Sequence, residues 1–284
     1  MRILQICQSY PPMISGAALA AARLAEGLAA EGHDVLVIAA SDRREGYSTQ
    51  NGRLRIERLP SRPNPARVNQ RFLLWPQRAI NRLVHAFNPD IIHLHEPLLL
   101  GICGLRAARS LNIPVVLTLH QLPWFVAKYT PSFWGSPIRF DWLLWQYGRW
   151  FLSQCAAVIA QAKPVATIIR QHAWRTAHII PNGADLQHSG RRGARGGGGA
   201  GGRRGGRGPP TGNPEQAKRM GLAGREISLQ FSHEALIERH AQLYQVICPK
   251  PRPYVAHYGR SGSLQNENAA ETAGTAVFRA MREE

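Results

Sequence analysis

Two segments of this 284-residue chain place histidines directly after strand-like apolar runs. The sequence His93-Leu94-His95-Glu96 closes one run, and His120 follows the next run, residues 115–119. The carboxyl ends of parallel strands meet at one edge of a sheet, where a doubly wound fold binds its ligand. We therefore expect His95, Glu96 and His120 to line a crevice at that edge and to contact a polar substrate there.

The spacing of His93 and His95 also allows a metal site. Residues two apart on a strand face the same side, as two metal ligands would. No third ligand stands at a suitable spacing, so zinc is disfavoured and we predict no bound metal and no cofactor. A packed, hydrogen-bonded histidine pair is the structural alternative.

A turn of small residues separates the first apolar run from the first helical stretch. It reads PPMISGAA over residues 11–18. At Ser15 and Gly16, backbone N–H groups and the positive end of the following helix could approach a phosphate. The turn is not G-x-G-x-x-G and lacks the accompanying acid, which disfavours NAD; a tight strand-to-helix turn without a ligand is the alternative.

Alternating apolar runs and helical stretches must position these residues. The runs cover residues 3–7, 35–40, 91–94, 115–119 and 156–160, and the helical stretches cover 16–31, 77–87, 99–111, 138–154 and 163–172. Buried strands that alternate with helices indicate a parallel sheet covered on both faces. We predict an α/β, doubly wound, Rossmann-like domain over residues 1–187, with six or more parallel strands.

The composition changes sharply after residue 187. The formal net charge is +17, and six Arg with no acid lie within residues 188–210. Residues 188–211 are therefore predicted to be a disordered Gly/Arg linker. An RGG-like RNA-binding tract is the alternative, but the tract is short and lacks interleaved Phe or Tyr, so nucleic acid is a disfavoured partner.

Two further helical stretches follow this linker, within residues 212–247. In the second, residues 232–247, Ser232 offers an N-cap. Its apolar stripe is predicted to pack on the N-terminal domain and consists of Leu236, Ile237, His240, Leu243, Tyr244 and Ile247. Residues 248–284 read as a polar tail.

The remaining features concern localisation. The four cysteines are scattered, which is typical of reduced thiols in a cytoplasmic protein, and no run of 18 apolar residues predicts a transmembrane helix. Residues 124–151 are rich in aromatic side chains that alternate with Arg139 and Arg149. Core packing explains part of this pattern, and contact with the inner membrane surface or a lipid-linked acceptor is the other interpretation.

Six segments, in order, resemble the N-terminal domain of family 4 glycosyltransferases, which are two-domain enzymes of the GT-B type. They are the residue 11–18 turn, LAEGL with GHDV (24–28 and 32–35), PDIIHLH (89–95), TLH (118–120), AVIA (157–160) and IPNGAD (180–185). After the linker, residues 213–221, 231–234 and 243–244 resemble the closing helices of the same family.

This resemblance implies transfer of a hexose from a nucleotide sugar to a sugar or lipid-linked acceptor, with retention and without a metal. His120 would be the catalytic residue that contacts the transferred sugar. Gly16 would approach the donor diphosphate, and Ser15, His95, Glu96 and Asn182 would complete the substrate site.

The resemblance is interrupted where the donor-binding domain should stand, between residues 185 and 213. We therefore expect donor binding and transfer to be absent or impaired in this chain. A non-catalytic acceptor- or lipid-binding protein is a further alternative.

Overall fold

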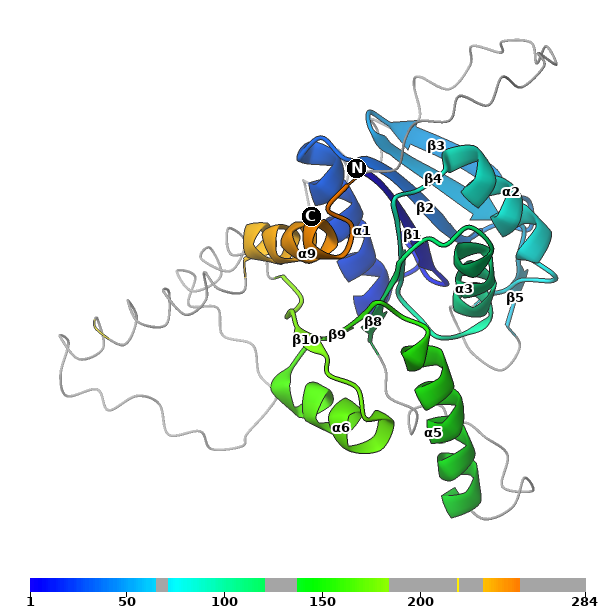
Figure 1. The fold of residues 1–284 in the computed structure, drawn as a ribbon. Coiled ribbons are helices and arrows are strands. Elements are labelled where there is room, and N and C mark those ends of the chain that lie inside the picture. Colours follow the sequence, from blue (N-terminus) through cyan, green and yellow to red (C-terminus); the bar gives the residue numbers. More distant parts are fainter. Residues whose placement is uncertain (65–70, 121–136, 184–218, 220–231, 251–284) are drawn as a thin grey trace, which may run out of the picture. The chain divides into compact units, whose positions relative to one another are not determined.

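The computed structural model describes residues 1–64, 71–120, 137–183, 219 and 232–250. The predicted Gly/Arg linker, the first closing helix and most of the polar tail lie outside these residues. Within them, eight strands form one sheet in the order β10-β9-β8-β7-β1-β2-β4-β3 (Figure 1). All neighbouring pairs are parallel except β3 and β4, so the predicted doubly wound α/β fold is confirmed.

The strands of the sheet follow the apolar runs closely. Their bounds are β1 (Arg2–Cys7), β2 (Asp34–Ala40), β3 (Tyr47–Asn51), β4 (Leu54–Leu59), β7 (Ile91–Leu94), β8 (Val115–Leu119), β9 (Ala157–Ala160) and β10 (His178–Ile179). A separate antiparallel pair is formed by β5 (Arg62–Pro63) and β6 (Arg71–Phe72). The hairpin β3–β4 and the pair β5–β6 were not predicted.

Helices cover both faces of the sheet. One face carries α2 (Gln77–Phe87), α3 (Leu99–Ser110), α5 (Pro137–Ser153) and α6 (Lys163–Ala173), whose apolar side chains join one core cluster. The other face carries α1 (Gly16–Ala30) and α9 (His233–Ile247), which contribute to a second cluster. Alternate side chains of β1 enter the two cores, since Leu4 and Ile6 lie in the first and Ile3 and Cys7 in the second.

Helix α1 has capped ends. The Ser15 hydroxyl accepts a hydrogen bond from the Ala18 amide at 3.0 Å, and Gly32 follows the helix with a φ of +88°. Glycine tolerates this left-handed conformation without a steric penalty. Helix α1 therefore begins at Gly16, within the residue 11–18 turn, and ends at Ala30, one residue before the end of the predicted stretch.

The closing helix α9 packs against α1, as the apolar stripe predicts (Figure 1). The Ser232 hydroxyl caps it by accepting from the Ala235 amide, and Leu236, Ile237, His240, Leu243 and Tyr244 are all buried. Gly27 of α1 leaves the space that Ile237 fills, because a Cβ built there would lie 2.0 Å from the Ile237 Cδ1 atom. Burial of these side chains contributes roughly 1.5–3 kcal/mol each for the larger apolar ones.

The described cysteines are all free, and Cys7, Cys103 and Cys155 are buried. Among the described helices, none combines the length and the apolar character that crossing a bilayer requires.

Candidate functional site

The carboxyl edge of the sheet brings two of the predicted residues, His95 and His120, together with a third polar residue, Gln161. His95 follows β7 directly, His120 follows β8, and Gln161 holds the equivalent place after β9. Nδ1 of His95 lies 3.1 Å from Nε2 of His120, and Gln161 Nε2 contacts His120 Nδ1. At the inner end, Nε2 of His95 lies 3.2 Å from Gln5 Oε1 on β1. We call these four residues the histidine chain.

The hydrogen bonds of the histidine chain run in a single direction. The Gln161 amide donates to His120 Nδ1, which leaves the His120 proton on Nε2 to donate to His95 Nδ1. His95 then carries its own proton on Nε2 and donates to the Gln5 carbonyl. Both imidazoles are neutral in this arrangement.

Burial supports the neutral form of these rings. Burial, together with the smaller effect of the neighbouring His240, lowers the pKa of His120 to about 4. Burial also holds the pKa of His95 well below its usual value, with His120 and His240 adding to the effect. Near neutral pH the two rings therefore act as neutral hydrogen-bonding groups.

His93 has a different environment from its neighbour His95, although the two rings stack at 4.4 Å. It is fully buried, with Nε2 at 2.7 Å from Thr118 Oγ1 and Nδ1 at 2.6 Å from the Tyr244 hydroxyl. Both of its nitrogens are thus engaged within the protein. Among the described residues, no group of three or more His, Cys, Asp or Glu could hold a metal ion.

Glu96 lies beside the turn that joins β1 to α1. Burial raises its pKa to about 7, and hydrogen bonds from the backbone N–H groups of Gln8 and Ser9 oppose that rise. A carboxyl group that titrates near neutral pH can take up or release a proton during a reaction. The loop after β7 therefore presents an ionisable group next to the neutral histidine chain.

The amino end of α1 is open at Gly16. Apart from its chain neighbours and the backbone of its own helix, no atom of the described residues lies within 4 Å of a Cβ built on Gly16, and the first turn of the helix has no acidic side chain. The helix N-terminus carries partial positive charge and free N–H groups, which suit an anion. Ser15 uses its hydroxyl to cap the helix, so its side chain fixes the geometry of this turn.

Asn182 follows the short strand β10 by three residues. It is exposed, and the next residue, Gly183, accepts a hydrogen bond from Arg23 and packs against His233. This segment therefore meets the start of α9. Its predicted contact with substrate stays a prediction.

The sequence analysis missed four residues that surround the site: Gln5, Gln161, His240 and Tyr244. Gln5 is a lone polar residue in an apolar strand, and Gln161 follows a strand as His120 does. The positions of Gln5 and Gln161 in the sequence could therefore have identified both as candidate site residues. The approach of His240 and Tyr244 depends on how α9 docks, which no local pattern encodes.

The chain matches the family Glycosyltransferase Family 4 over residues 14–188. It is 34% identical over 188 residues to a GDP-mannose-dependent alpha-mannosyltransferase of Mycolicibacterium smegmatis, which covers 66% of this chain and 48% of that protein. It is 27% identical over 192 residues to an alpha-monoglucosyldiacylglycerol synthase of Acholeplasma laidlawii, covering 66% and 47%. The chain thus spans about half the length of these relatives.

A solved structure has the same fold. Sucrose-phosphate synthase of Thermosynechococcus elongatus superposes with a TM-score of 0.50 and 18% identity, over 66% of this chain and 49% of that one. The family match covers residues 14–188, which contain His95, Glu96, His120 and the open end of α1. The chain belongs to glycosyltransferase family 4 and has the Rossmann-like fold of a GT-B half.

Proposed function

We propose that residues 1–187 form the acceptor-side half of a retaining hexosyltransferase that uses a nucleotide-sugar donor. The observation that carries this proposal is the neutral histidine chain beside the open N-terminus of α1. The two features occupy the carboxyl edge of one sheet, where doubly wound folds bind ligands. The named relatives, which include a GDP-mannose-dependent mannosyltransferase, support a hexose donor.

Each part of this edge has a role in the proposed reaction. Backbone N–H groups at Gly16 approach the donor diphosphate, and the edge of His120 contacts the transferred sugar. Glu96 and His95 lie on the acceptor side, where Glu96 exchanges a proton near neutral pH. Holding donor and acceptor in one cleft would supply the proximity term of catalysis, which can reach about 7–11 kcal/mol.

The same proposal includes low activity for this chain alone. The donor-binding half would supply the groups that stabilise the leaving diphosphate, which is a large electrostatic contribution in such reactions. The resemblance to that half is missing between residues 185 and 213, and the chain spans about half of its relatives. Residues 212–247 would be the closing helices that return to the N-terminal domain.

Contact with a membrane surface fits the exposed aromatic side chains of α5. Trp142 is 62% exposed and Trp150 is 46% exposed, while Trp145 is buried against His172. Arg149 lies 4.1 Å from the Trp174 ring, which is exposed as well. Aromatic rings beside arginine suit the interface between lipid headgroups and acyl chains. A lipid-linked acceptor and work at the cytoplasmic membrane surface are therefore part of the proposal.

The test is sugar transfer from GDP-mannose and from nucleotide-glucose donors. Four proteins would be compared: the native chain, its His120→Ala variant, and each of these two joined to the donor-binding half of a relative. We expect activity only in the joined native protein. Strong transfer by the native chain, abolished in His120→Ala, would contradict the low activity proposed for this chain. Equal transfer by both joined proteins would contradict the role of His120.

A further inference from the structure

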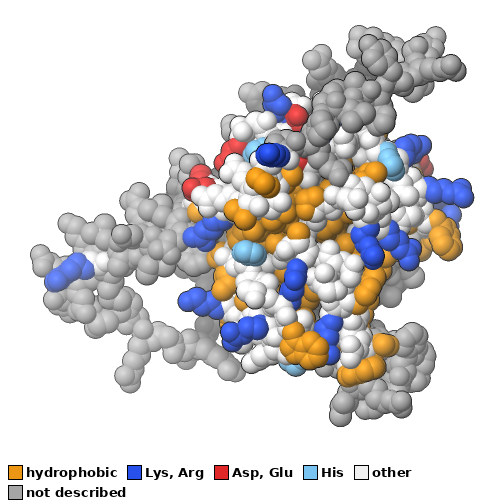
Figure 2. All heavy atoms as spheres, in the orientation of Figure 1, with side chains coloured by type: hydrophobic (Ala, Val, Ile, Leu, Met, Phe, Trp, Pro, Cys, Tyr) orange, Lys and Arg blue, Asp and Glu red, His pale blue; other side chains and the backbone are white. Residues whose placement is uncertain are grey.

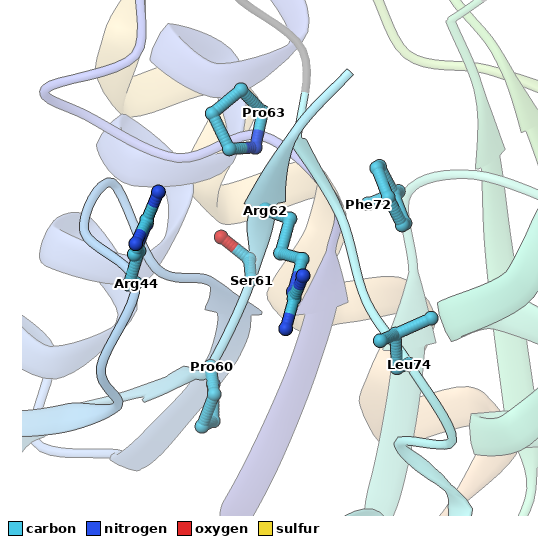
Figure 3. Close-up of a pocket in the computed structure, with 7 residues that line it drawn as sticks. All are labelled: Arg44, Pro60, Ser61, Arg62, Pro63, Phe72 and Leu74. Atoms are coloured by element: carbon cyan, nitrogen blue, oxygen red, sulfur yellow. The ribbon is translucent and has the colours of Figure 1, made fainter. Parts of the chain in front are cut away.

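A ligand-sized hollow lies at the same sheet edge, on the far side of β1 and β2 from the histidine chain. It encloses about 720 Å³ beside the carboxyl end of β4. Figure 3 shows Arg44 on one side of Ser61 and Arg62 on the other, with Phe72 and Leu74 across from Arg62. The seven lining residues are Arg44, Pro60, Ser61, Arg62, Pro63, Phe72 and Leu74.

Hydrogen bonds to the backbone fix the floor of this pocket. Ser61 is buried, and its hydroxyl donates to the Ser41 carbonyl at 2.5 Å while it accepts from Arg71 Nε at 2.6 Å. The Arg71 guanidinium also donates to the carbonyls of Arg43 and Ser61. Arg71 is thus a structural group that ties β5 and β6 to the loop after β2, and the pocket is preformed.

The two lining arginines differ from Arg71. Arg44 and Arg62 are exposed, and neither side chain forms a hydrogen bond or ion pair with another residue of the described ranges. Each guanidinium offers a planar fork of donors that matches phosphate oxygens in pairs. Figure 2 shows basic side chains spread across one face of the molecule with few acidic ones among them, and the whole chain has a formal net charge of +17, so its overall field favours an anion.

The opposite wall of the pocket is apolar and continues outward. Phe72 is 36% exposed, Leu74 is 61% exposed and Trp75 is 91% exposed. Trp75 also has a φ of +51°, an unusual conformation for a bulky side chain. An exposed apolar strip of this kind normally marks a surface that is covered by a partner or ligand.

We propose that the Arg44–Arg62 pocket binds the phosphate of an amphiphile whose apolar part lies along Phe72, Leu74 and Trp75. The basic wall and the apolar strip are adjacent, so one ligand with both characters satisfies them together. In the proposed function this amphiphile is the sugar acceptor. Its binding requires no transfer, however, and can be measured separately.

The experiment uses the full chain with two charge variants of equal net charge. R44Q/R62Q removes the proposed phosphate ligands, and R106Q/R170Q removes two exposed arginines from α3 and α6. The probes are glycerol 3-phosphate in solution, and vesicles of phosphatidylcholine with and without phosphatidylglycerol. A third variant, L74S/W75S, removes apolar area beside the pocket. Circular dichroism checks that all variants fold.

We expect R44Q/R62Q to bind glycerol 3-phosphate and the anionic vesicles about tenfold more weakly than R106Q/R170Q does. L74S/W75S should weaken vesicle binding and retain glycerol 3-phosphate binding. Equal weakening in both charge variants would overturn the site, because overall charge would then explain binding. If R44Q/R62Q loses glycerol 3-phosphate binding but binds vesicles as before, the ligand is not an amphiphile. The pocket would then bind a free phosphate compound.

These results are independent of the transfer assay. If the binding results are as expected while the joined His120→Ala protein stays active, the proposed role of His120 in transfer is wrong. The proposal that the Arg44–Arg62 pocket binds a ligand is then unaffected. If transfer depends on His120 while R44Q/R62Q binds like its control, the pocket fails and the proposed function stands.

Discussion

The hydroxyl of Tyr244 on α9 lies 2.6 Å from Nδ1 of His93 on β7, although 151 residues separate them. Both side chains are fully buried, so this hydrogen bond joins the closing helix to the sheet in a region without water. His93 in turn contacts Thr118 at the end of β8 and stacks on His95. The position of α9 is thereby linked to the residues that carry the proposed chemistry.

Tyr244→Phe should therefore destabilise the fold. The variant keeps the aromatic ring and leaves a ring nitrogen of His93 without its partner, at a cost of about 1–3 kcal/mol. Chemical denaturation followed by far-ultraviolet circular dichroism measures the loss. Val246→Ala on the same helix removes a side chain that is 80% exposed and should leave stability nearly unchanged. Equal stability of Tyr244→Phe and the native chain would show that the hydrogen bond contributes nothing.

Gly27→Ala should weaken the contact between α1 and α9. The new methyl group would lie 2.0 Å from Ile237 Cδ1, and relieving such an overlap costs roughly 1–3 kcal/mol. Gly148→Ala on α5 is the matched control, since its nearest neighbour would be 3.9 Å away and alanine favours a helix. In an Ile237→Ala background Gly27→Ala should cost little, and a double-mutant cycle by denaturation measures this coupling. Additive effects of the two substitutions would contradict the overlap.

Glu96 should make stability depend on pH near neutrality. Burial raises its pKa from 4.5 to about 7 in the folded chain, so the folded state holds a proton that the unfolded state has lost. Its contribution is full below pH 4.5 and disappears as the pH rises through about 7, a change of up to about 3 kcal/mol. Glu96→Gln should flatten this decline in unfolding experiments from pH 5 to 8. If the free energy of unfolding of Glu96→Gln falls with pH as steeply as that of the native chain, Glu96 is not the group that titrates in this range.

Gln161→Glu should raise the pKa of His120 above its value of about 4. The substituted carboxylate would stand where the Gln161 amide now contacts His120 Nδ1, and a neighbouring negative charge favours the imidazolium. Nitrogen-15 NMR titration of labelled histidine measures the shift. Gln242→Glu, on an exposed position of α9, adds the same charge and should leave His120 unchanged. A shift of equal size in the two variants would point to a long-range effect.

The sequence predicts the parallel core well because buried strands and helices have strong apolar patterns. Ile91–Leu94 and Val115–Leu119 were found on that basis, together with the residues that follow them. The hairpin β3–β4 was missed since Tyr47–Asn51 is largely exposed and polar. Its one clear signal is Gly52, the first residue of the two-residue turn Gly52-Arg53, where φ is +55°.

The site was also predicted only in part, because chain order indicates which residues follow the strands but not which distant residues they contact. The place of His95 and His120 at strand ends follows from chain order and the rule that parallel strands end together. The bond between His95 and Gln5 joins residues 90 apart in sequence, and it depends on the register of β1 against β7. Periodicity does not encode that register. The same limit applies to the arginine-lined pocket, because Arg44 and Phe72 meet only once β5 pairs with β6.

The single direction of the histidine chain makes its outer and inner ends interdependent. Each neutral ring has one proton, so a ligand at the edge that turned the Gln161 amide oxygen toward His120 Nδ1 would place the His120 proton on Nδ1 and make Nε2 an acceptor. His95 would then carry its proton on Nδ1 and donate it to His120 Nε2, which withdraws the hydrogen bond from His95 Nε2 to Gln5 Oε1 on β1. Gln5 is buried, and its amide nitrogen has no partner among the described residues; a half-turn of the amide would present that nitrogen as a donor to His95 Nε2. Sugar binding at the edge could thus be registered as the turning of one amide inside the core.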